Sequence, residues 1–170
     1  IHPYNDEKII AGQGTAAKEL IEKVPDLEAI ICPVSGGGLL SGTLLAAKNL
    51  KPDIKVFGAE PENADDTYRS ILNNKIMSNK TTDTIADGLR AQVGTVTFPI
   101  IKENVDKILL VSEKMIISSM YMIWQRLKII IEPSCSIVLA ALMLNSKKFL
   151  NKKVGLILTG GNYDLKQIPW

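Results

Sequence analysis

Short apolar runs alternate with longer segments of helical periodicity along this chain. The clearest runs cover residues 27–34, 54–60 and 107–111, and a further one, "KVGLILTGGN", covers residues 153–162. Continuous apolar runs are typical of strands buried on both faces, and strands that alternate with helices form parallel sheets. The pattern predicts an α/β fold: an open, mainly parallel sheet of four or five strands, with five or six helices on both of its faces.

The length and composition suit one globular domain. Of the 170 residues, 46% are hydrophobic, which is enough for a sizeable core. The 20 basic and 18 acidic residues are spread along the chain, so neither nucleic acid nor a membrane is indicated as a partner. Two distant cysteines and the absence of a charged-then-apolar signal segment favour a soluble protein of the reducing cytoplasm.

Capping residues predict where some helices begin. Thr15 is expected to cap a helix over residues 14–24, and Asn63 to cap a helix over residues 63–75. The segment 75–99 lacks periodicity and is rich in Thr, Gly and Asp, so it is expected to be a long functional loop. Further helices are expected over residues 39–50, 112–128 and 132–144.

Three consecutive glycines, Gly36, Gly37 and Gly38, stand between a predicted strand and a predicted helix. This arrangement lets backbone N–H groups and a helix N-terminus converge on an anion, most often a phosphate. The alternative is a tight turn in which one glycine is needed. A dinucleotide site of the G-x-G-x-x-G type would place a ribose-binding acid at Glu60, but Ser41 stands where its third glycine belongs.

Four acids, Glu60, Glu62, Asp65 and Asp66, lie at the end of the next strand and the start of the next helix. Carboxylate oxygens of this kind bind hard cations such as Mg²⁺, Mn²⁺ or Ca²⁺. The alternative is structural: Asn63 caps the helix, and the two aspartates interact with the helix dipole.

Two further polar residues stand at element ends. Glu132 precedes a helix with Pro133 in its first turn, so it either serves the helix dipole or faces a site. Thr159 ends the last strand, where open α/β sheets bind ligands, although a second tight turn is the alternative. The only histidine, His2, stands beside Pro3, so no Ser-His-Asp arrangement can be assembled.

Six motifs in this order, "GQGT", "PVSGGGLLSG", "AEPENADD", "TIADGLR", "IIEPS" and "LTGGNYDL", resemble the fold-type II pyridoxal-phosphate enzymes. The pattern is most similar to the serine racemase and serine/threonine dehydratase family. The resemblance implies the tryptophan-synthase-β-like fold. It also implies removal of the Cα proton from small hydroxy amino acids, followed by β-elimination or racemisation.

The resemblance assigns cofactor contacts to particular residues. The hydroxyl of Thr159 would face the pyridine nitrogen, and Asp87, Gly88 and Glu132 would line the cofactor pocket. The phosphate of pyridoxal phosphate would be held by the glycine loop, which consists of Ser35, Gly36, Gly37, Gly38 and Leu39.

Two further sites follow from the same resemblance. A divalent cation, Mg²⁺, Mn²⁺ or Ca²⁺, would be bound by Glu60, by the backbone carbonyl of Ala64 and by Asp66. Lys128 and Asn162 match positions that contribute to an ATP site at the subunit interface of the racemases.

One family feature is absent. Family members carry the Schiff-base lysine in an upstream S-x-K-x-R-G segment, followed by a small domain that holds the substrate carboxylate, and neither occurs in residues 1–170. The chain then corresponds to the C-terminal part of the large domain, as a fragment or as the product of a split or decayed gene. We expect it to be inactive alone and to need a homo-oligomeric partner or the missing N-terminal half before it can act on a small amino acid. The alternative is a non-catalytic nucleotide-binding or regulatory module.

Overall fold

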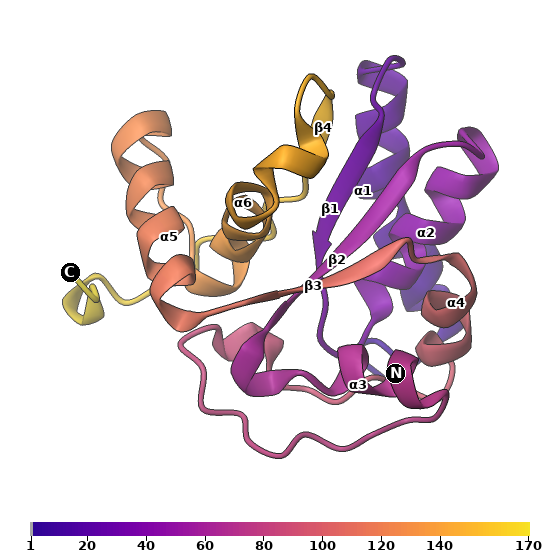
Figure 1. Ribbon diagram of the computed structural model, residues 1–170, viewed down its shortest axis with the longest axis horizontal. Coiled ribbons are helices and arrows are strands. Elements are labelled where there is room, and N and C mark those ends of the chain that lie inside the picture. The colour runs from indigo at the N-terminus through magenta and orange to yellow at the C-terminus, as the bar shows by residue number, and fades with distance from the viewer. Residues whose placement is uncertain (1) are drawn as a thin grey trace.

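The strands form one open parallel sheet, which confirms the predicted α/β class (Figure 1). The computed structural model describes residues 2–170. In this part of the chain the strand order is β3-β2-β1-β4. The four strands are β1 (Ala29–Pro33), β2 (Lys55–Pro61), β3 (Lys107–Val111) and β4 (Val154–Leu156).

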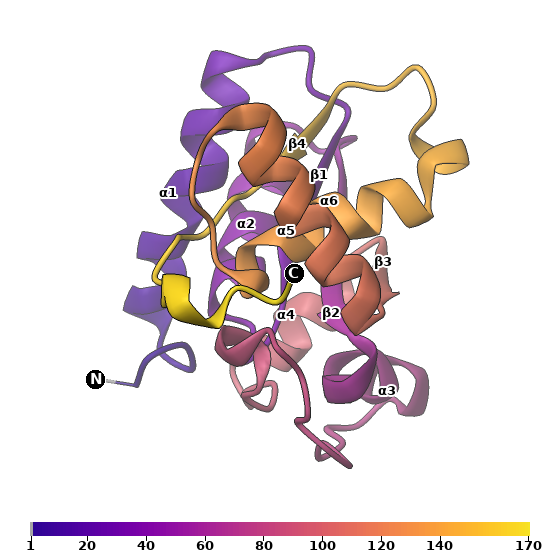
Figure 2. The ribbon, with the colours of Figure 1, turned by 90° about the vertical axis from the view of Figure 1, so that its left-hand side faces the viewer.

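Helices cover both faces of the sheet, as predicted. The first group, α1, α2 and α4, lies on one face, and α5 and α6 lie on the other (Figures 1 and 2). Within residues 2–170 the α-helices are α1 (Glu7–Lys23), α2 (Gly38–Leu50), α3 (Asp66–Asn73), α4 (Thr97–Asn104), α5 (Glu113–Leu127) and α6 (Pro133–Leu144). None of the helices described is long and apolar enough to cross a membrane.

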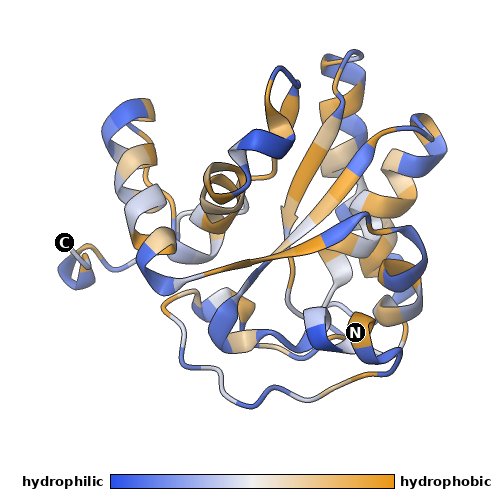
Figure 3. Ribbon diagram, viewed as in Figure 1, coloured by the Kyte–Doolittle hydropathy of each residue, from blue (hydrophilic) through white to orange (hydrophobic). Residues whose placement is uncertain are grey.

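Successive side chains along each strand point to opposite faces of the sheet, so the apolar core around the sheet consists of one cluster on each face. Ile30 and its neighbour in register, Val56, belong to the cluster that packs under α1 and α2. Ile31 and its neighbour Phe57 belong to the cluster that packs under α6. All five residues of β1 are buried, and the ribbon of β1 is coloured as hydrophobic along most of its length (Figure 3). This burial explains why the strand sequences are continuously apolar.

The predicted start of the first helix is wrong. Helix α1 does not begin at residue 14 with Thr15 as its cap but follows Asp6, whose carboxylate accepts a hydrogen bond from the backbone N–H of Lys8 (2.9 Å). Thr15 lies inside the helix, and its hydroxyl donates to the carbonyl of Gly12 (2.7 Å). The glycines of this segment therefore do not break the helix.

A close crossing of two helices accounts for one of these glycines. A Cβ atom on Gly14 would lie 2.8 Å from the carbonyl oxygen of Gly42 in α2, which is closer than real Cβ contacts. Glycine at this position lets α1 and α2 approach each other, and α1 thereby packs against the helix that follows the glycine loop.

The segment 75–99 is shorter as a loop than predicted, because α4 begins inside it at Thr97. Pro99 lies in the first turn of α4, where a missing N–H breaks no helical hydrogen bond. A single 3₁₀ turn, Asp87–Leu89, interrupts the remaining loop.

Candidate functional site

A cavity of about 280 Å³ lies where the strands β1 and β4 end. The carboxyl edge of a parallel sheet is the usual ligand-binding edge of α/β proteins. The wall of the cavity combines the glycine loop with segments that are distant in sequence. These lining residues include Tyr4, Gln13, Ser35, Gly36, Gly37, Gly38, Leu39, Gly88, Ala91, Glu132, Ser134 and Thr159.

The glycine loop presents bare backbone to this cavity. Gly37 has φ of 92°, a left-handed conformation that L side chains rarely adopt. Across residues 2–170, the backbone N–H groups from Gly36 to Leu40 find no protein acceptor. Nor does any side chain in the described part of the chain cap the first turn of α2. Unpaired N–H groups at the positive end of a helix dipole are an arrangement that suits an anion.

No basic side chain of the described residues lines this cavity. Among the described lining residues the only charged side chain is that of Glu132. The charge of a bound phosphate would thus be stabilised by backbone N–H groups and the dipole of α2, with no ammonium or guanidinium group beside it.

The side-chain hydroxyl groups of Thr97 and Ser35 fix the position of the glycine loop through hydrogen bonds. The Thr97 hydroxyl donates to the carbonyl of Gly36 (2.7 Å) and accepts from the N–H of Gly94 (2.9 Å). The Ser35 hydroxyl accepts from the N–H of Ala91 (2.9 Å) and lies 3.0 Å from the carbonyl oxygen of the same residue. The side chain of Ser35 is therefore bonded to the neighbouring loop at Ala91. The contact with phosphate that was predicted for Ser35 would have to come from its backbone.

Replacing Thr97 with valine is expected to loosen the glycine loop. The change removes two hydrogen bonds to buried backbone groups, although the N–H of Gly94 still donates to the carbonyl of Gly36 (3.1 Å), so the free energy of unfolding should fall by about 1 kcal/mol. Thr95→Val is the matched control, because Thr95 is exposed and accepts a single hydrogen bond from the amide of Asn5. Chemical denaturation of both variants checks this, and equal losses would contradict the role assigned to Thr97.

The turn that carries Thr159 is fixed by the segment before α6. The N–H of Glu132 donates to the carbonyl of Gly160 (3.1 Å), and its carboxylate accepts from the N–H of Asn162 (3.0 Å). A Cβ on Gly161 would collide with the carbonyl of Ile130, so this glycine allows a close backbone approach. Glu132 thereby positions the turn in which Thr159 reaches the cavity.

The "ADG" motif contributes one of its two predicted residues to the cavity. The N–H of Gly88 donates to the hydroxyl of Ser134 (2.9 Å), and both residues line the cavity. Asp87 is exposed, and its carboxylate accepts from the N–H of Gly88 (3.0 Å) instead of facing the cavity. The structure thus brings Gly88, Glu132 and Thr159 to the glycine loop and leaves Asp87 outside.

Tyr4, Gln13 and Ser134 line the cavity but were not among the predicted residues. The ring of Tyr4 lies against Gly36, where a Cβ would collide with it. Tyr4 precedes α1 in a segment without apolar periodicity, and only the tertiary fold brings it to the glycine loop.

Two of the four acids in the cluster are buried, and the other two are not. The buried carboxylate of Glu60 accepts hydrogen bonds from the N–H groups of Thr67 (2.9 Å) and Tyr68 (2.8 Å) and thereby caps α3. Asn63 does not cap this helix, contrary to the alternative prediction, because its amide donates to the carbonyl of Asp83 (2.8 Å). The cap is supplied from the end of β2, which sequence periodicity could not reveal.

Asp66 is the second buried acid. One of its carboxylate oxygens accepts from the N–H of Val93 (2.7 Å), and the other has no partner within residues 2–170. Burial raises the pKa of Asp66 to about 6. Burial also raises the pKa of Glu60 to about 8, with a contribution from the charge of Asp66. A cation beside these two groups would stabilise their ionised forms.

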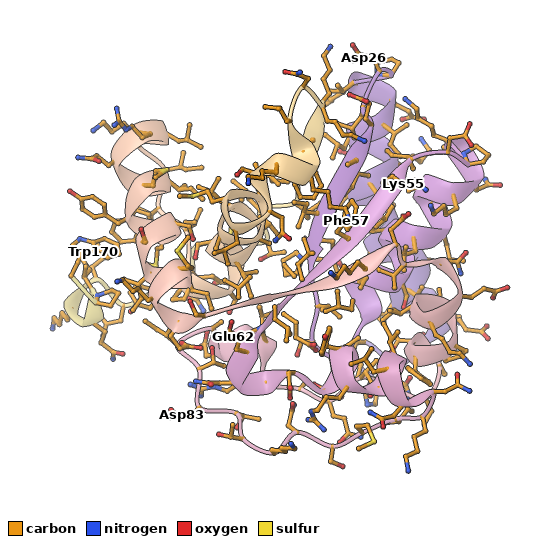
Figure 4. All side chains as sticks on the ribbon, in the orientation of Figure 1. Asp26, Lys55, Phe57, Glu62, Asp83 and Trp170 are labelled. Atoms are coloured by element: carbon orange, nitrogen blue, oxygen red, sulfur yellow. The ribbon has the colours of Figure 1, made fainter. Side chains whose placement is uncertain are left out.

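Of the two remaining acids, Glu62 is at the surface and Asp65 is half-buried. Glu62 is exposed (Figure 4), and Asp65 pairs with the Nε of Arg69 at 2.7 Å. In the described part of the chain no three His, Cys, Asp or Glu side chains gather at metal-binding distance. A divalent cation would consequently depend on Glu60 and Asp66 together with backbone oxygens such as that of the buried Ala64, and on water.

The residues proposed for ATP both lie at the surface. Lys128 ends α5 in a left-handed conformation with φ of 59° and is exposed. Asn162 is also exposed and is joined through its N–H to Glu132. Both residues therefore flank the segment between α5 and α6.

Comparisons with known proteins agree with this geometry. Residues 1–160 match the family described as pyridoxal-phosphate dependent enzyme. Serine racemase from Dictyostelium discoideum is 55% identical over 99% of this chain and 53% of its own length. The β-hydroxyaspartate dehydratase from Paracoccus denitrificans is 45% identical over 100% of this chain and 54% of its own.

A solved structure shows the same fold. A threonine deaminase from T.th. has a TM-score of 0.92 and 40% identity over 96% of this chain and 55% of its own. The chain thus spans about half the length of the relatives that it matches. The profile match over most of the chain, the sequence identity and the shared fold lead to one conclusion: this chain belongs to the pyridoxal-phosphate dependent enzyme family.

Proposed function

We propose that this chain forms the cofactor-phosphate-binding part of an ammonia-lyase or racemase that uses pyridoxal phosphate and acts on small hydroxy amino acids. The proposal rests on the N–H groups from Gly36 to Leu40 at the start of α2, which have no acceptor within residues 2–170. The choice of substrate class is supported by relatives named serine racemase, β-hydroxyaspartate dehydratase and threonine deaminase.

Each part of the cavity would have a separate task. The glycine loop would hold the phosphate group, and Glu132 would keep the turn of Thr159 in place. When bound, pyridoxal phosphate would act as an electron sink that acidifies the Cα–H bond of the amino acid. The Thr159 hydroxyl would be a neutral partner for the pyridine nitrogen and would supply no negative charge to stabilise a protonated ring nitrogen.

The amine that bonds the cofactor and moves the Cα proton is proposed to come from outside this chain. Within residues 2–170, no lysine lines the cavity. The chain alone is accordingly proposed to be inactive. Exposed apolar side chains at the end of α5, Leu127 (59%), Ile129 (43%) and Ile130 (54%), support contact with a second copy or with an N-terminal half.

A divalent cation is proposed at Glu60, the Ala64 carbonyl and Asp66. The free carboxylate oxygen of buried Asp66 fits this role, because an unpartnered buried oxygen is costly unless something binds it. By the resemblance alone, Lys128 and Asn162 are proposed to contact ATP where two subunits meet.

Parallel titrations with pyridoxal phosphate, NAD and ATP test the proposed function. Backbone amide NMR of the chain should show pyridoxal phosphate shifting the signals of residues 36–40, with inorganic phosphate competing for the same signals. NAD and ATP should shift these signals much less. A stronger response to NAD or ATP at residues 36–40 would support a nucleotide-binding module and contradict the proposal.

A further inference from the structure

A second cavity, of about 220 Å³, lies at the opposite edge of the sheet, where β1 and β2 begin. Lys55 and Phe57 from the start of β2 line it (Figure 4). Three more lining residues, Lys148, Phe149 and Lys152, come from the connection between α6 and β4. We call this space the lysine cavity. It shares no lining residue with the cavity at the glycine loop.

The floor of the lysine cavity is apolar and well packed. The rings of Phe57 and Phe149 meet edge to face with centroids 5.1 Å apart, and both residues are buried. Ala29 lies beside Lys55 in the β1–β2 register, and its small side chain leaves the space open. Lys55 and Phe57 are two residues apart on one strand and so share a face.

One of the three lysines has a carboxylate partner. Lys55 lies 3.1 Å from Asp106, the only acid among the described residues that line the lysine cavity. Asp106 also interacts with Lys48 (3.3 Å) and accepts a hydrogen bond from the N–H of Val56 (2.8 Å). Burial opposes ionisation of Asp106, but these three contacts outweigh it and lower its pKa. Asp106 is therefore ionised, and its charge is already shared between two lysines.

The other two lysines have no carboxylate within 4.0 Å in residues 2–170. The Nζ of Lys148 lies 4.5 Å above the ring centroid of Phe57 and so points over the floor. By contrast, the neighbouring Lys153 pairs with Asp26. Lys148 and Lys152 are both exposed and thus place two positive charges without a carboxylate partner at the rim of one apolar hollow, where an anion could pair with both.

We propose that the lysine cavity binds a small organic dianion, a phosphate monoester with an apolar body. Two lysine ammonium groups without a carboxylate partner match the double charge of a phosphate monoester, which lysine binds as a point charge. The apolar floor would contact the carbon part of the ligand. This site differs from the cofactor site, where backbone N–H groups would hold the phosphate, and it does not depend on the proposed function.

Phenyl phosphate is the probe for this site, and amide NMR of the chain is the readout. Saturable shifts are expected at residues 29, 55–57, 149 and 152, apart from any shifts at residues 36–40. Lys148→Met keeps the apolar stem over Phe57 but removes the charge. Lys148→Met and Lys152→Ala should each weaken binding at the lysine cavity about tenfold, the loss of one charge-assisted contact.

Lys147→Ala is the matched control, because Lys147 belongs to the same 3₁₀ turn but does not line the cavity. Its affinity should change less than about twofold. Equal weakening by Lys147→Ala, or shifts confined to residues 36–40, would overturn the proposal. Binding of inorganic phosphate as tight as that of phenyl phosphate would overturn the assignment of an apolar body.

Discussion

Gly37→Val is expected to abolish phosphate binding at the glycine loop and to destabilise the fold. Gly37 has φ of 92°, and a Cβ there would lie 2.7 Å from the side chain of Ile101 and 2.8 Å from the hydroxyl of Thr97. A β-branched residue is strained in this conformation and has no space, so the free energy of unfolding should fall by about 3 kcal/mol or more. Denaturant unfolding and a phosphate titration followed by amide NMR measure the two effects.

Gly12→Ala provides the matched control for this experiment. A Cβ on Gly12 meets no atom within 4 Å, and Gly12 lies inside α1. Alanine there should raise the free energy of unfolding by up to about 1 kcal/mol and leave phosphate binding unchanged. If Gly37→Val bound phosphate as well as the unmodified chain, the glycine loop would not be the anion site.

Stability without a divalent cation is expected to fall as the pH rises from about 4 to 8. Burial raises the pKa of Glu60 from 4.5 to about 8 and that of Asp66 from 3.8 to about 6. The folded chain thus keeps protons that the unfolded chain loses over this range, and a raised folded-state pKa makes stability decrease with pH. Added Mg²⁺ or Mn²⁺ should reverse the loss of stability at pH 8. At pH 5 the cation should stabilise the chain only weakly, because protons compete with it for the two carboxylates.

Thermal unfolding at the two pH values measures this effect, with an expected rise in Tm of several degrees on adding the cation at pH 8. Glu60→Gln should remove the cation response, and it should also flatten the pH dependence. Glu62→Gln is the matched control, because Glu62 is exposed and lies two residues away. A Tm at pH 8 that does not respond to any of Mg²⁺, Mn²⁺ or Ca²⁺ would contradict the proposed cation site.

The strands and the glycine loop could be predicted because their signals are local. The predicted strand at residues 107–111 has the same bounds as β3, since a strand buried on both faces leaves a continuous apolar run. Likewise, the glycine run lies directly between β1 and α2. Neither feature needs knowledge of distant residues.

Features that depend on tertiary contacts could not be predicted. Gly14 weakens the helical signal of α1. A glycine is needed there because Gly42 of another helix, α2, approaches closely, which the sequence around Gly14 does not show. Helix α3 is capped by Glu60, which lies on β2 and not directly before the helix. From the local sequence alone, Asn63 was therefore the better candidate for the cap. Tyr4 reaches the cavity only through the fold.

We propose that the glycine loop holds the phosphate of pyridoxal phosphate and that none of the lysines of residues 2–170 bonds its aldehyde. The direct test incubates the chain with pyridoxal phosphate, reduces it with borohydride and maps labelled lysines by peptide mass spectrometry, while amide NMR of an unreduced sample follows residues 36–40. We predict shifts at residues 36–40 and no lysine labelled in stoichiometric amount. Stoichiometric labelling of one specific lysine in this chain would contradict the account.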